Sequence, residues 1–432
     1  MSSFSVFLVL VASFEVVVSQ LVEDIEFSWN PTKLPIKLSD SMANYMQGDN
    51  GDEDGFIIIT GGCDSHNGNE KLAVDSDFAS CMSTSKATFK FDPFENTFER
   101  MEDSNYERQR HTAVVMDGEL YVFGGRDTDD NLVAEIESFN PKANTWTSRG
   151  KLPENIVTSD LTGWAWKNYI YLTGGFVADY SASGGTIRID FTDNPSELTE
   201  EHMDTSLEDS PIPRGDFHAV VLFGYAYLAG GFSHKDWCQA LKTTERYHME
   251  SDTWQTLADM NVGRADMAVA SLNNRIVTIG GEEKPEVCVS DPAYGSHPSH
   301  HVDVILDPQK GKDSEWLEFG KFNDKRFRFA AAVVPALGQI YTFGGQLPFD
   351  FTCDCFPTTD DVAVGKEVLA ESPEGNGSFI AAIALGSILG VLILIMVIRA
   401  CMSVQRKKAL EANAAIAGKE EMEFAPEGGL QA

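Results

Sequence analysis

The sequence predicts an all-β domain built as a ring of six repeated sheets, followed by one transmembrane α-helix. The first observation is a glycine pair that recurs six times, at intervals of 50 to 64 residues. The second is a short run before each pair that is rich in β-branched and aromatic residues, which is typical of a buried strand. The third is an uncharged run at 379–398. The chain has 432 residues, 43% of them hydrophobic, which is sufficient for a large core.

Residues 1–19 have the features of a secretory signal peptide. The apolar run at 6–14 is too short to span a bilayer, and Val18 and Ser19 before Gln20 resemble a small-residue cleavage site. The alternative is a buried N-terminal strand, because the segment starts without Lys or Arg and contains Glu15. We favour the signal peptide, which places the rest of the chain in the secretory pathway.

The glycine pairs divide residues 20–365 into six units. They are Gly61-Gly62, Gly124-Gly125, Gly174-Gly175, Gly230-Gly231, Gly280-Gly281 and Gly344-Gly345. Four units have a Tyr three positions before the first glycine, and in four units an Arg lies 16 residues before it: Arg108, Arg214, Arg264 and Arg328. After most pairs, a turn rich in Asn, Asp and Pro separates an aromatic or Leu residue from a bulky partner, which predicts a hairpin. Each unit is therefore expected to form four antiparallel strands, packed on its neighbours around an axis.

The ring is expected to close through its N-terminal strand. The sixth unit has no downstream Trp, whereas Glu26 to Trp29 resemble an orphan fourth strand near the mature N-terminus. Pairing this strand with the sixth unit would join the two ends of the domain and remove exposed strand edges.

These recurring features together resemble Kelch repeats. The resemblance covers about residues 22–365 and implies a six-bladed Kelch-type β-propeller. Some units depart from the pattern: Tyr45 replaces the Arg in the first, and Thr158 and Leu198 replace the Arg and the Trp in the third. In Kelch proteins, the face that carries the loops between blades commonly receives ligands.

The segment 379–398 is long enough to span a bilayer as a helix. Arg399 and a basic cluster at 406–408 follow it, whereas the preceding linker, 366–378, carries three Glu and only one Lys, so the tail at 399–432 is predicted to be cytoplasmic. This topology is that of a single-pass type I membrane protein. Two further predictions concern this region. Small residues on one ridge of the helix could support a homodimer, and the Cys that follows it could be palmitoylated. The residues are Ala382, Gly386, Gly390 and Cys401.

Six cysteines lie in the predicted extracellular part, and an even number in this compartment indicates disulfides. Cys238 and Cys288 occupy equivalent positions after their glycine pairs, so we favour pairing them with each other. The next pair is Cys63 with Cys81, which leaves Cys353 and Cys355. A bond between these last two would close a strained ring, and a redox switch is the minor alternative to a structural role.

The charge of the chain excludes some partners. Asp and Glu number 66 and Lys and Arg 33, so nucleic acid is not an expected partner. The segment 49–55 has the oxygen-rich composition of a calcium loop but lacks its spacing, so calcium is possible while an acidic turn is favoured. A histidine-containing run at 295–301 is favoured as a loop over a metal site, and no metal or other cofactor is expected.

Two functions remain open. The first is a binding module that holds a protein or glycan on its loop face, where Arg108, Arg214, Arg264 and Arg328 are candidate ligands, although a purely structural role for them is favoured. The second, implied by the Kelch resemblance, is a sugar-active enzyme of the copper-radical oxidase or mutarotase type. His111 and His218 lie on predicted inner strands, but no free Cys accompanies them. Because no catalytic motif is found, binding is favoured.

Overall fold

The computed structural model describes residues 22–64, 69–70, 80–233, 240–283, 297–353 and 355–369. All of them lie within residues 1–369, which form one of the two compact parts of the chain. The predicted signal peptide, the predicted span at 379–398, Cys401 and the 366–378 linker beyond 369 lie outside this part of the chain. No helix within the described ranges is long and apolar enough to cross a membrane.

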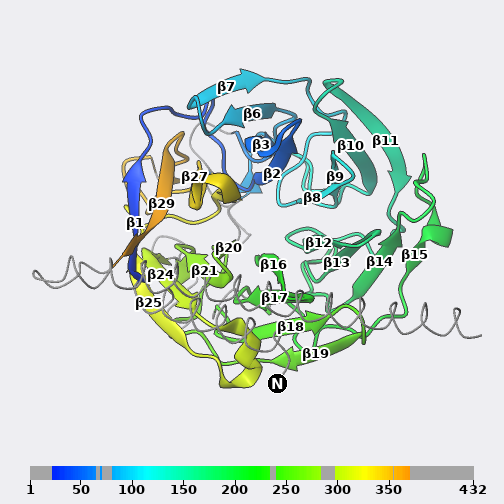
Figure 1. Cartoon of the computed structure of the whole chain (residues 1–432). Helices are drawn as coiled ribbons and strands as arrows, with labels where there is room; N and C mark the ends of the chain where they lie inside the picture. Colours follow the sequence, from blue (N-terminus) through cyan, green and yellow to red (C-terminus); the bar gives the residue numbers. More distant parts are fainter. Residues whose placement is uncertain are drawn as a thin grey trace, which may run out of the picture. The chain divides into compact units, whose positions relative to one another are not determined.

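The described strands form a β-propeller (Figure 1). Four separate four-stranded sheets form units 1 to 4. Unit 1 contains β2 (Met42–Gly48), β3 (Gly51–Thr60), β6 (Thr88–Asp92) and β7 (Thr97–Arg100). Unit 2 contains β8 (Thr112–Met116), β9 (Glu119–Phe123), β10 (Glu135–Asn140) and β11 (Thr145–Lys151). Unit 3 contains β12 (Thr162–Trp166), β13 (Tyr169–Thr173), β14 (Thr186–Asp190) and β15 (Met203–Asp204). Unit 4 contains β16 (Ala219–Leu222), β17 (Tyr225–Ala229), β18 (Thr244–His248) and β19 (Thr253–Thr256).

The remaining large sheet has eight strands and consists of two four-stranded halves. Unit 5 contains β20 (Ala268–Leu272), β21 (Arg275–Ile279), β24 (His301–Ile305) and β25 (Trp316–Lys321). Unit 6 contains β26 (Ala330–Val334), β27 (Gln339–Phe343), β29 (Val362–Leu369) and β1 (Val22–Trp29). The halves are joined by a short parallel pairing of β1 with β25. Counted in this way, the described strands make six four-stranded units, each of them antiparallel.

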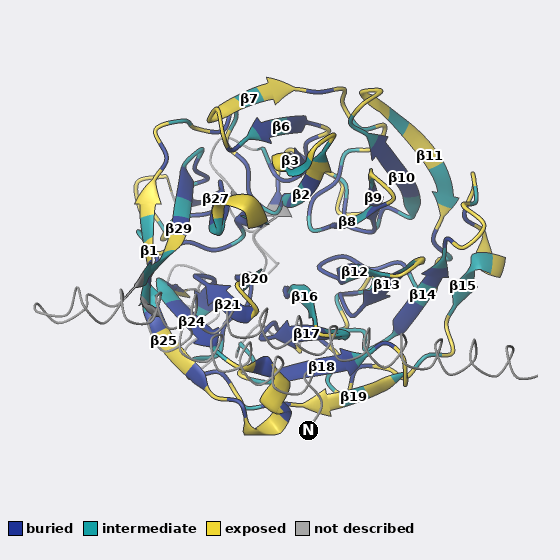
Figure 2. Ribbon diagram, in the orientation of Figure 1, coloured by how far each residue is buried: buried dark blue, intermediate teal, exposed yellow. Residues whose placement is uncertain are grey.

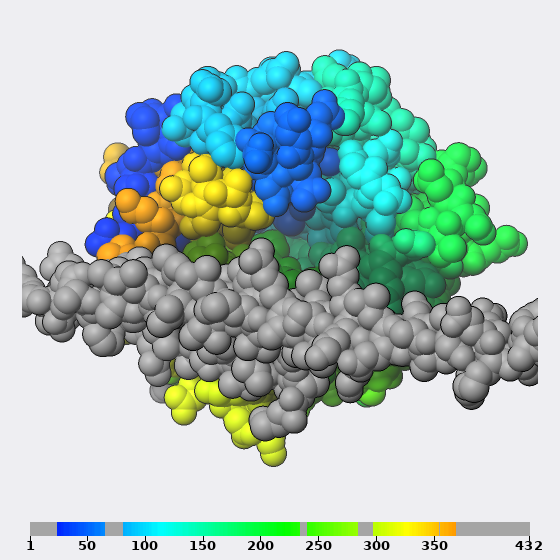
Figure 3. Space-filling view, in the orientation of Figure 1, coloured from blue at the N-terminus to red at the C-terminus, as the bar shows by residue number. Residues whose placement is uncertain are grey.

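The first strand of the chain is the outer strand of the last unit. β1 pairs antiparallel with β29, so that Trp29 stands opposite Ala363. In the space-filling view (Figure 3), residues from the start of the domain, in blue, lie against those of its end, in yellow and orange. The propeller is therefore closed by strands from both ends of the domain, which leaves no exposed edge there.

Short strands and 3₁₀ helices lie in the loops between the main strands. They are β4 (Asn69–Glu70), β5 (Ser80–Cys81), β22 (Glu282–Glu283), β23 (His297–Pro298), β28 (Cys355–Phe356) and the 3₁₀ helices η1 (Glu200–His202), η2 (Pro308–Asp313) and η3 (Pro335–Leu337). β28, β4 and β5 form a small sheet that links the long loop of unit 6 to that of unit 1.

In the four units that have a Tyr before the glycine pair, this Tyr packs one unit against the next. The ring of Tyr121 in unit 2 meets Phe191, at the end of β14 in unit 3, with ring centroids 4.9 Å apart. Tyr341 in unit 6 likewise meets Phe91 in unit 1 at 5.4 Å. These rings are buried, and Figure 2 shows that burial is greatest in the two middle strands of the units, such as β17 and β18, while outer strands such as β7 and β19 are more exposed. The core is therefore a series of apolar layers between units, which explains why the sequence repeats the same residues.

The glycine pairs permit close approach between loops. Gly124 and Gly125 have φ angles of +66° and +88°, which favour glycine. A Cβ on Gly124 would lie 2.3 Å from the carbonyl oxygen of Thr158, in the loop that enters the next unit. A side chain here would push neighbouring units apart.

Candidate binding site on the ring face

One residue from each unit forms a closed circle of backbone hydrogen bonds around the propeller axis. The six residues, which we call the charged ring, are Asp40, Arg110, Asp160, Asp216, Asp266 and Arg328. In each, the N–H donates to the carbonyl oxygen of the ring residue in the preceding unit, at 2.7 to 3.1 Å, and Asp40 donates to Arg328. The circle has six members, which gives an independent count of the units.

The backbone of the charged ring is left-handed at every position, with φ between 51° and 58°. Asp adopts this conformation more readily than most residues, which accounts for four of the six positions. The residue before each ring member forms an isolated β-bridge with the residue that follows the glycine pair of its own unit, as Gln109 does with Arg126. The entering loop and the loop after the glycine pair therefore lie on one face, which we call the ring face.

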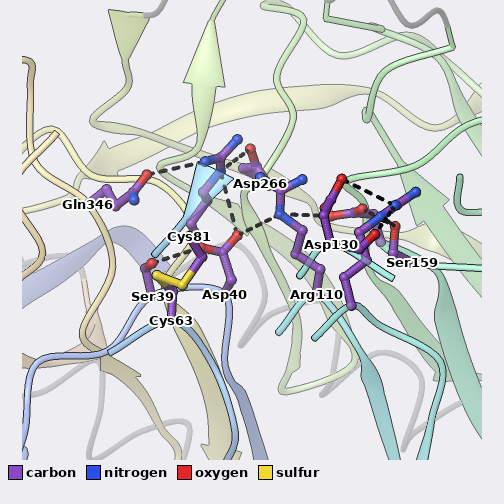
Figure 4. Close-up of polar contacts among 12 residues, drawn as sticks. Ser39, Asp40, Cys63, Cys81, Arg110, Asp130, Ser159, Asp266 and Gln346 are labelled. Atoms are coloured by element: carbon purple, nitrogen blue, oxygen red, sulfur yellow. Dashed lines mark hydrogen bonds and ion pairs between the residues drawn. A yellow bond between two sulfur atoms is a disulfide. The ribbon is translucent and has the colours of Figure 1, made fainter. Parts of the chain in front are cut away.

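The side chains of the charged ring form a partial ion-pair network (Figure 4). Asp40 lies between the two arginines, with its Oδ1 3.5 Å from Arg110 Nε and 3.6 Å from Arg328 Nε. Arg110 also lies 3.7 Å from Asp160, and Arg328 lies 3.0 Å from Asp266. Serine hydroxyls support the network: Ser39 Oγ donates to Asp40 at 2.7 Å and Ser159 Oγ donates to Asp160 at 2.8 Å.

Asp216 is the exception in the charged ring. It lies between Asp160 and Asp266 in the circle, and within the described ranges it has no ion pair. Burial, followed by the charges of Asp266 and Asp160, raises the pKa of Asp216 well above its ordinary value. The carboxyl group of Asp216 therefore holds a proton at a pH where an exposed aspartate would be ionised.

The same surroundings also shift the pKa values of Asp266 and Arg110. Burial raises the pKa of Asp266 to about 7, although Arg328 opposes the shift. Burial disfavours the charged form of Arg110, but the carboxylates of Asp160 and Asp40 outweigh it and raise the pKa of the guanidinium. Both arginines therefore stay charged, while Asp216 and Asp266 take up a proton more readily than an exposed aspartate does.

Two cavities lie along the axis at the charged ring. The smaller, of about 40 Å³, is lined by all six ring residues together with Ser41, His111 and His218. The larger, of about 290 Å³, continues between the innermost strands and is lined mainly by small and apolar residues such as Ala219 and Ala332. The site therefore has a charged mouth above an apolar channel.

The residues after the glycine pairs surround the charged ring and form its rim. Arg126 is buried, and its guanidinium donates to Ser159 Oγ at 2.9 Å and to the Val177 carbonyl at 2.9 Å. It also lies under the ring of Tyr180, at 3.8 Å from the centroid, and Tyr180 donates to Asp130. This rim connects units 2 and 3 beside the charged ring.

Three of the arginines proposed as ligands are turned into the protein. Arg108, Arg214 and Arg264 are at most 2% exposed. Each donates to the carbonyl of the first glycine of its unit at 2.7 to 3.0 Å and pairs with a buried carboxylate, such as Glu245 at 2.9 Å from Arg214. In this conformation they tie loops together, which is the structural role that the sequence favours for them. In unit 3, Thr158 takes their place and donates to Gly174 at 3.0 Å.

Arg328 does not occupy the same position as the other three. Arg326 takes the structural position in unit 6, donating to the Gly344 carbonyl at 2.8 Å. The turn between β26 and β27 contains η3, which adds residues and shifts the count from the glycine pair. Arg328 is consequently a member of the charged ring, where its side chain is 14% exposed.

Two disulfides are present in the described part of the chain. Cys63 is bonded to Cys81 and Cys353 to Cys355. Both lie on the ring face, in the long loops of units 1 and 6. Cys238 and Cys288, the pair that the sequence favours most, lie outside the described residues.

The remaining candidates from the sequence are the acidic segment 49–55 and several histidines. The acidic segment 49–55 includes the turn between β2 and β3, where Asp54 accepts hydrogen bonds from Asn50 at 2.9 and 3.0 Å. His300 and His301 stack on each other at the start of β24. No group of three or more His, Cys, Asp or Glu in the described ranges is arranged to hold a metal ion. His111 and His218 line the small cavity, and burial lowers their pKa values to about 3 and about 4.

Comparison with known proteins agrees with this architecture. The family model described as the KLHDC2/KLHL20/DRC7 Kelch-repeats domain matches residues 54–281. The chain belongs to the Kelch-repeat family. The structure titled "Structure of YjhT" matches this Kelch propeller with a TM-score of 0.57 and 14% identity, covering 78% of this chain and 99% of that one, which supports the fold alone.

Curated Kelch proteins match part of the chain. Kelch-like protein 26 of Danio rerio is 26% identical over 53% of this chain and 34% of its own length. Beta-scruin of Limulus polyphemus is 26% identical over 54% of this chain and 24% of its own length. This Kelch chain therefore corresponds to about a third or less of these two relatives.

The charged ring is not apparent from the repeat pattern of the sequence. A signal exists: in units 2, 4 and 5 a charged residue stands two positions after the repeated Arg, at Arg110, Asp216 and Asp266. These residues differ in sign, so they do not repeat as a residue type. The shared left-handed backbone and the circle of backbone hydrogen bonds reveal them as equivalent.

Proposed function

We propose that this Kelch propeller is a binding module, anchored to a membrane, that holds a protein partner on its ring face. The observation that carries the proposal is the convergence of entering loops and post-glycine loops around a charged, cavity-bearing centre. Loops placed on a rigid scaffold are the usual location of binding residues. The kinship with Kelch-repeat proteins favours a protein partner over a glycan.

Exposed apolar side chains on the ring face support a protein partner. Phe351, in the long loop of unit 6, is 68% exposed, and Met82, in the long loop of unit 1, is 56% exposed. The small sheet of β28, β4 and β5 connects these two loops. Aromatic residues and Met are enriched at protein interfaces, and such side chains gain most when a partner covers them.

The anchoring part of the proposal rests on the sequence. An uncharged run at 379–398 with basic residues after it supports a type I topology, with the propeller outside the cell or in a lumen. Residues Ala382, Gly386 and Gly390 would allow two copies to associate in the membrane, and Cys401 would be open to palmitoylation. Disulfides on the propeller suit an oxidising compartment.

Affinity capture tests the binding function. The full chain is displayed on cells and screened against secreted and membrane-bound proteins, and each hit is retested with Phe351→Glu and Met82→Glu variants. We expect each substitution to weaken binding at least about tenfold, because the partner would bury the new carboxylate in the interface without a cation to pair with it. Phe223→Glu is the matched control, since Phe223 is 44% exposed but lies in the β16–β17 turn on the opposite face.

Two outcomes contradict the proposal. One is a partner whose binding depends on Phe223 and not on Phe351 or Met82. The other is a propeller that is protected from protease added to intact cells, with the tail accessible, which would reverse the topology.

A further inference from the structure

The two disulfides on the ring face differ in how exposed their cysteines are. Cys63 and Cys81 are both buried, at 0% and 4% exposed. In the second bond Cys355 is 1% exposed, whereas Cys353 lies at the surface. A thiol in solution therefore reaches the second bond from one side, at Cys353. Exposed disulfides are the ones that exchange most easily with thiols.

The exposed disulfide contributes little as a restraint on the chain. Cys353 and Cys355 are two positions apart, whereas the bond between Cys63 and Cys81 spans 18 residues. A disulfide stabilises a protein mainly by restricting its unfolded chain, and this effect shrinks with the length of the loop that the bond closes. Loop restriction therefore explains the long bond better than the short one.

Other contacts already hold the backbone around the short disulfide. The N–H of Asp350 donates to the Cys355 carbonyl at 2.8 Å, and the N–H of Cys355 donates back to Asp350 at 3.3 Å. β28 also pairs with β4 of unit 1. The ring of Phe356, which is 4% exposed, lies 5.1 Å from that of Phe349 and 5.4 Å from that of Phe327. Because none of these contacts involves a sulfur atom, the loop keeps its anchors when the S–S bond opens.

The surroundings of Cys353 favour a protein thiol as the reagent. Phe351, two residues before Cys353, is 68% exposed and offers an apolar contact of the kind found in protein interfaces. Asp350, on the same loop, is exposed and carries a negative charge at neutral pH. Glutathione is itself an anion, so this charge and the acidity of the whole chain repel it.

We propose that Cys353 and Cys355 form a thiol–disulfide exchange site, whose substrate is an exposed cysteine thiol of the protein partner. The substrate thiolate attacks Cys353 Sγ, so that an S–S bond forms between the substrate and Cys353 while the bond to Cys355 breaks. Cys355 Sγ leaves with the electron pair and takes up a proton, which replaces the one that the substrate thiol lost. One disulfide is exchanged for another, so no oxidant or reductant is consumed.

The two cysteines have different roles in this exchange. Cys353 receives the substrate because it is exposed, and Cys355 is the resolving residue because its thiol stays buried beside the mixed disulfide. Renewed attack by Cys355 on Cys353 Sγ releases the substrate, so the covalent link is reversible. The identity of the substrate rests on the proposed function, because the partner is placed at Phe351, whereas the chemistry of the cysteine pair does not depend on it.

A small probe tests the exchange chemistry without any partner. The full chain is incubated at pH 7 and 8 with the acetylated tripeptide amide Gly-Cys-Gly, free thiols are capped with N-ethylmaleimide, and proteolytic fragments are mapped by mass spectrometry. We expect the tripeptide on Cys353 and the cap on Cys355, formed at least about tenfold faster than any adduct at Cys63 or Cys81. Glutathione at an equal thiolate concentration is expected to react more slowly.

Two single variants separate the roles of the cysteines. In Cys355→Ser, Cys353 keeps an exposed thiol and has no resolving residue. It should therefore attack the tripeptide supplied as its disulfide with thionitrobenzoate, retain the tripeptide and release thionitrobenzoate. In the matched control, Cys353→Ser, the remaining Cys355 thiol is buried and should react at least about tenfold more slowly. Mass spectrometry assigns each adduct to its cysteine, and the measurement on the unchanged chain does not depend on either variant folding.

The possible results are distinct. The exchange site is overturned if the Cys63–Cys81 bond exchanges as fast as the short bond, if the tripeptide attaches to Cys355, if the two variants react equally fast, or if no adduct forms at millimolar tripeptide. Faster reaction with glutathione overturns the protein substrate. Absence of exchange, with a partner still captured at Phe351, leaves the proposed function intact, whereas exchange at Cys353 with no partner on the ring face supports the site and contradicts the proposed function.

Discussion

The backbone N–H of Asp40 donates a hydrogen bond of 2.9 Å to the carbonyl oxygen of Arg328, and this contact joins the first unit of the propeller to the last. A second closure lies at the outer edge, where β1 pairs with β29. The N-terminal segment therefore closes the propeller at two places, near its axis and at its outer edge. Because the units form a closed circle, loosening the contact at the axis would expose the apolar layer between units 6 and 1, and loosening β1 would expose the layer between units 5 and 6, to which Ile25 belongs.

Ile25→Ala tests the outer closure. Ile25 is 1% exposed in β1 and packs in the cluster that includes Val304 and Ala363. Removing its side chain is expected to lower the free energy of unfolding by about 2–4 kcal/mol, through lost burial and the cavity left behind. Urea denaturation of the full chain gives the value. Glu26→Ala, at an exposed position in the same strand, should change it by less than about 0.5 kcal/mol; equal effects would show that β1 adds little to closure.

The repeat could be predicted because each recurring residue has one physical task. The glycines allow loops to touch, and the Tyr before them fills the layer between units, as Tyr121 does against Phe191. These tasks recur at a fixed distance along the strand, so they are visible in the sequence.

The charged ring could not be predicted in this way, because its members lie in loops of unequal spacing from the glycine pair. Asp40 precedes its pair by 21 residues, Arg110 by 14 and Arg328 by 16. The longer β2–β3 hairpin and the insertion of η3 account for the differences. Because of the same insertion, Arg328 has the 16-residue spacing of Arg108, whereas Arg326 has its structural position. Which carboxylates meet across the axis depends on closure of the whole ring, a property that no single repeat contains.

Arg264→Met tests the structural role of the buried arginines. The change leaves Asp303, which is 1% exposed, without its ion-pair partner, so we expect a loss of about 3–5 kcal/mol in unfolding free energy. Replacing both residues, with Asp303→Leu, should restore much of it. As a control, Arg188→Met breaks the pair with Asp204, in which both side chains are 34% exposed, and should cost at most about 1 kcal/mol. Recovery absent from the double variant would mean that Arg264 acts through other contacts.

The two disulfides are expected to differ in their effect on stability. The Cys63–Cys81 bond spans 18 residues, so replacing both cysteines with Ser should cost about 3 kcal/mol by releasing that loop in the unfolded chain. The Cys353–Cys355 bond spans 2 residues, and its removal should cost much less. Thermal unfolding of the two double-serine variants compares them directly. A larger loss for the Cys353 and Cys355 variant would mean that the short bond orders the loop around Phe351.

His111 should make the propeller sensitive to acid. Burial, reinforced by Arg108, lowers the pKa of His111 to about 3, whereas an unfolded histidine titrates near 6.5. Between these values the unfolded chain binds a proton that the folded chain refuses, so stability falls as pH drops from 6.5 towards 3, by about 1.4 kcal/mol per pH unit. Asp266, with its raised pKa, has the opposite sign: its contribution is lost as pH rises from about 4 to about 7.

The variant His111→Gln isolates the histidine contribution. Denaturation curves recorded from pH 7 to pH 4 should show a slope smaller by up to one proton than in the unchanged chain. His202→Gln is the control for the loss of a histidine as such, because His202 is only partly buried, in η1. If the His111 variant and the unchanged chain had identical slopes, the pKa of His111 in the folded chain would have to lie near its ordinary value.

Phe223→Asn is expected to stabilise the propeller. Phe223 has φ of +53° in the two-residue turn between β16 and β17, followed by Gly224 at +80°. The equivalent turn of unit 2 uses Asp117 and Gly118, and Asn-Gly is the preferred sequence for such a turn. Because Phe223 is 44% exposed, relief of the unfavourable backbone should exceed the lost burial, giving a gain of about 0.5–1 kcal/mol in denaturation. Asp117→Asn, a change between two residues that tolerate this conformation, should alter stability by less than about 0.5 kcal/mol. A gain in stability accompanied by loss of partner binding would explain why a phenylalanine stands at this turn, and would move the binding surface away from the ring face.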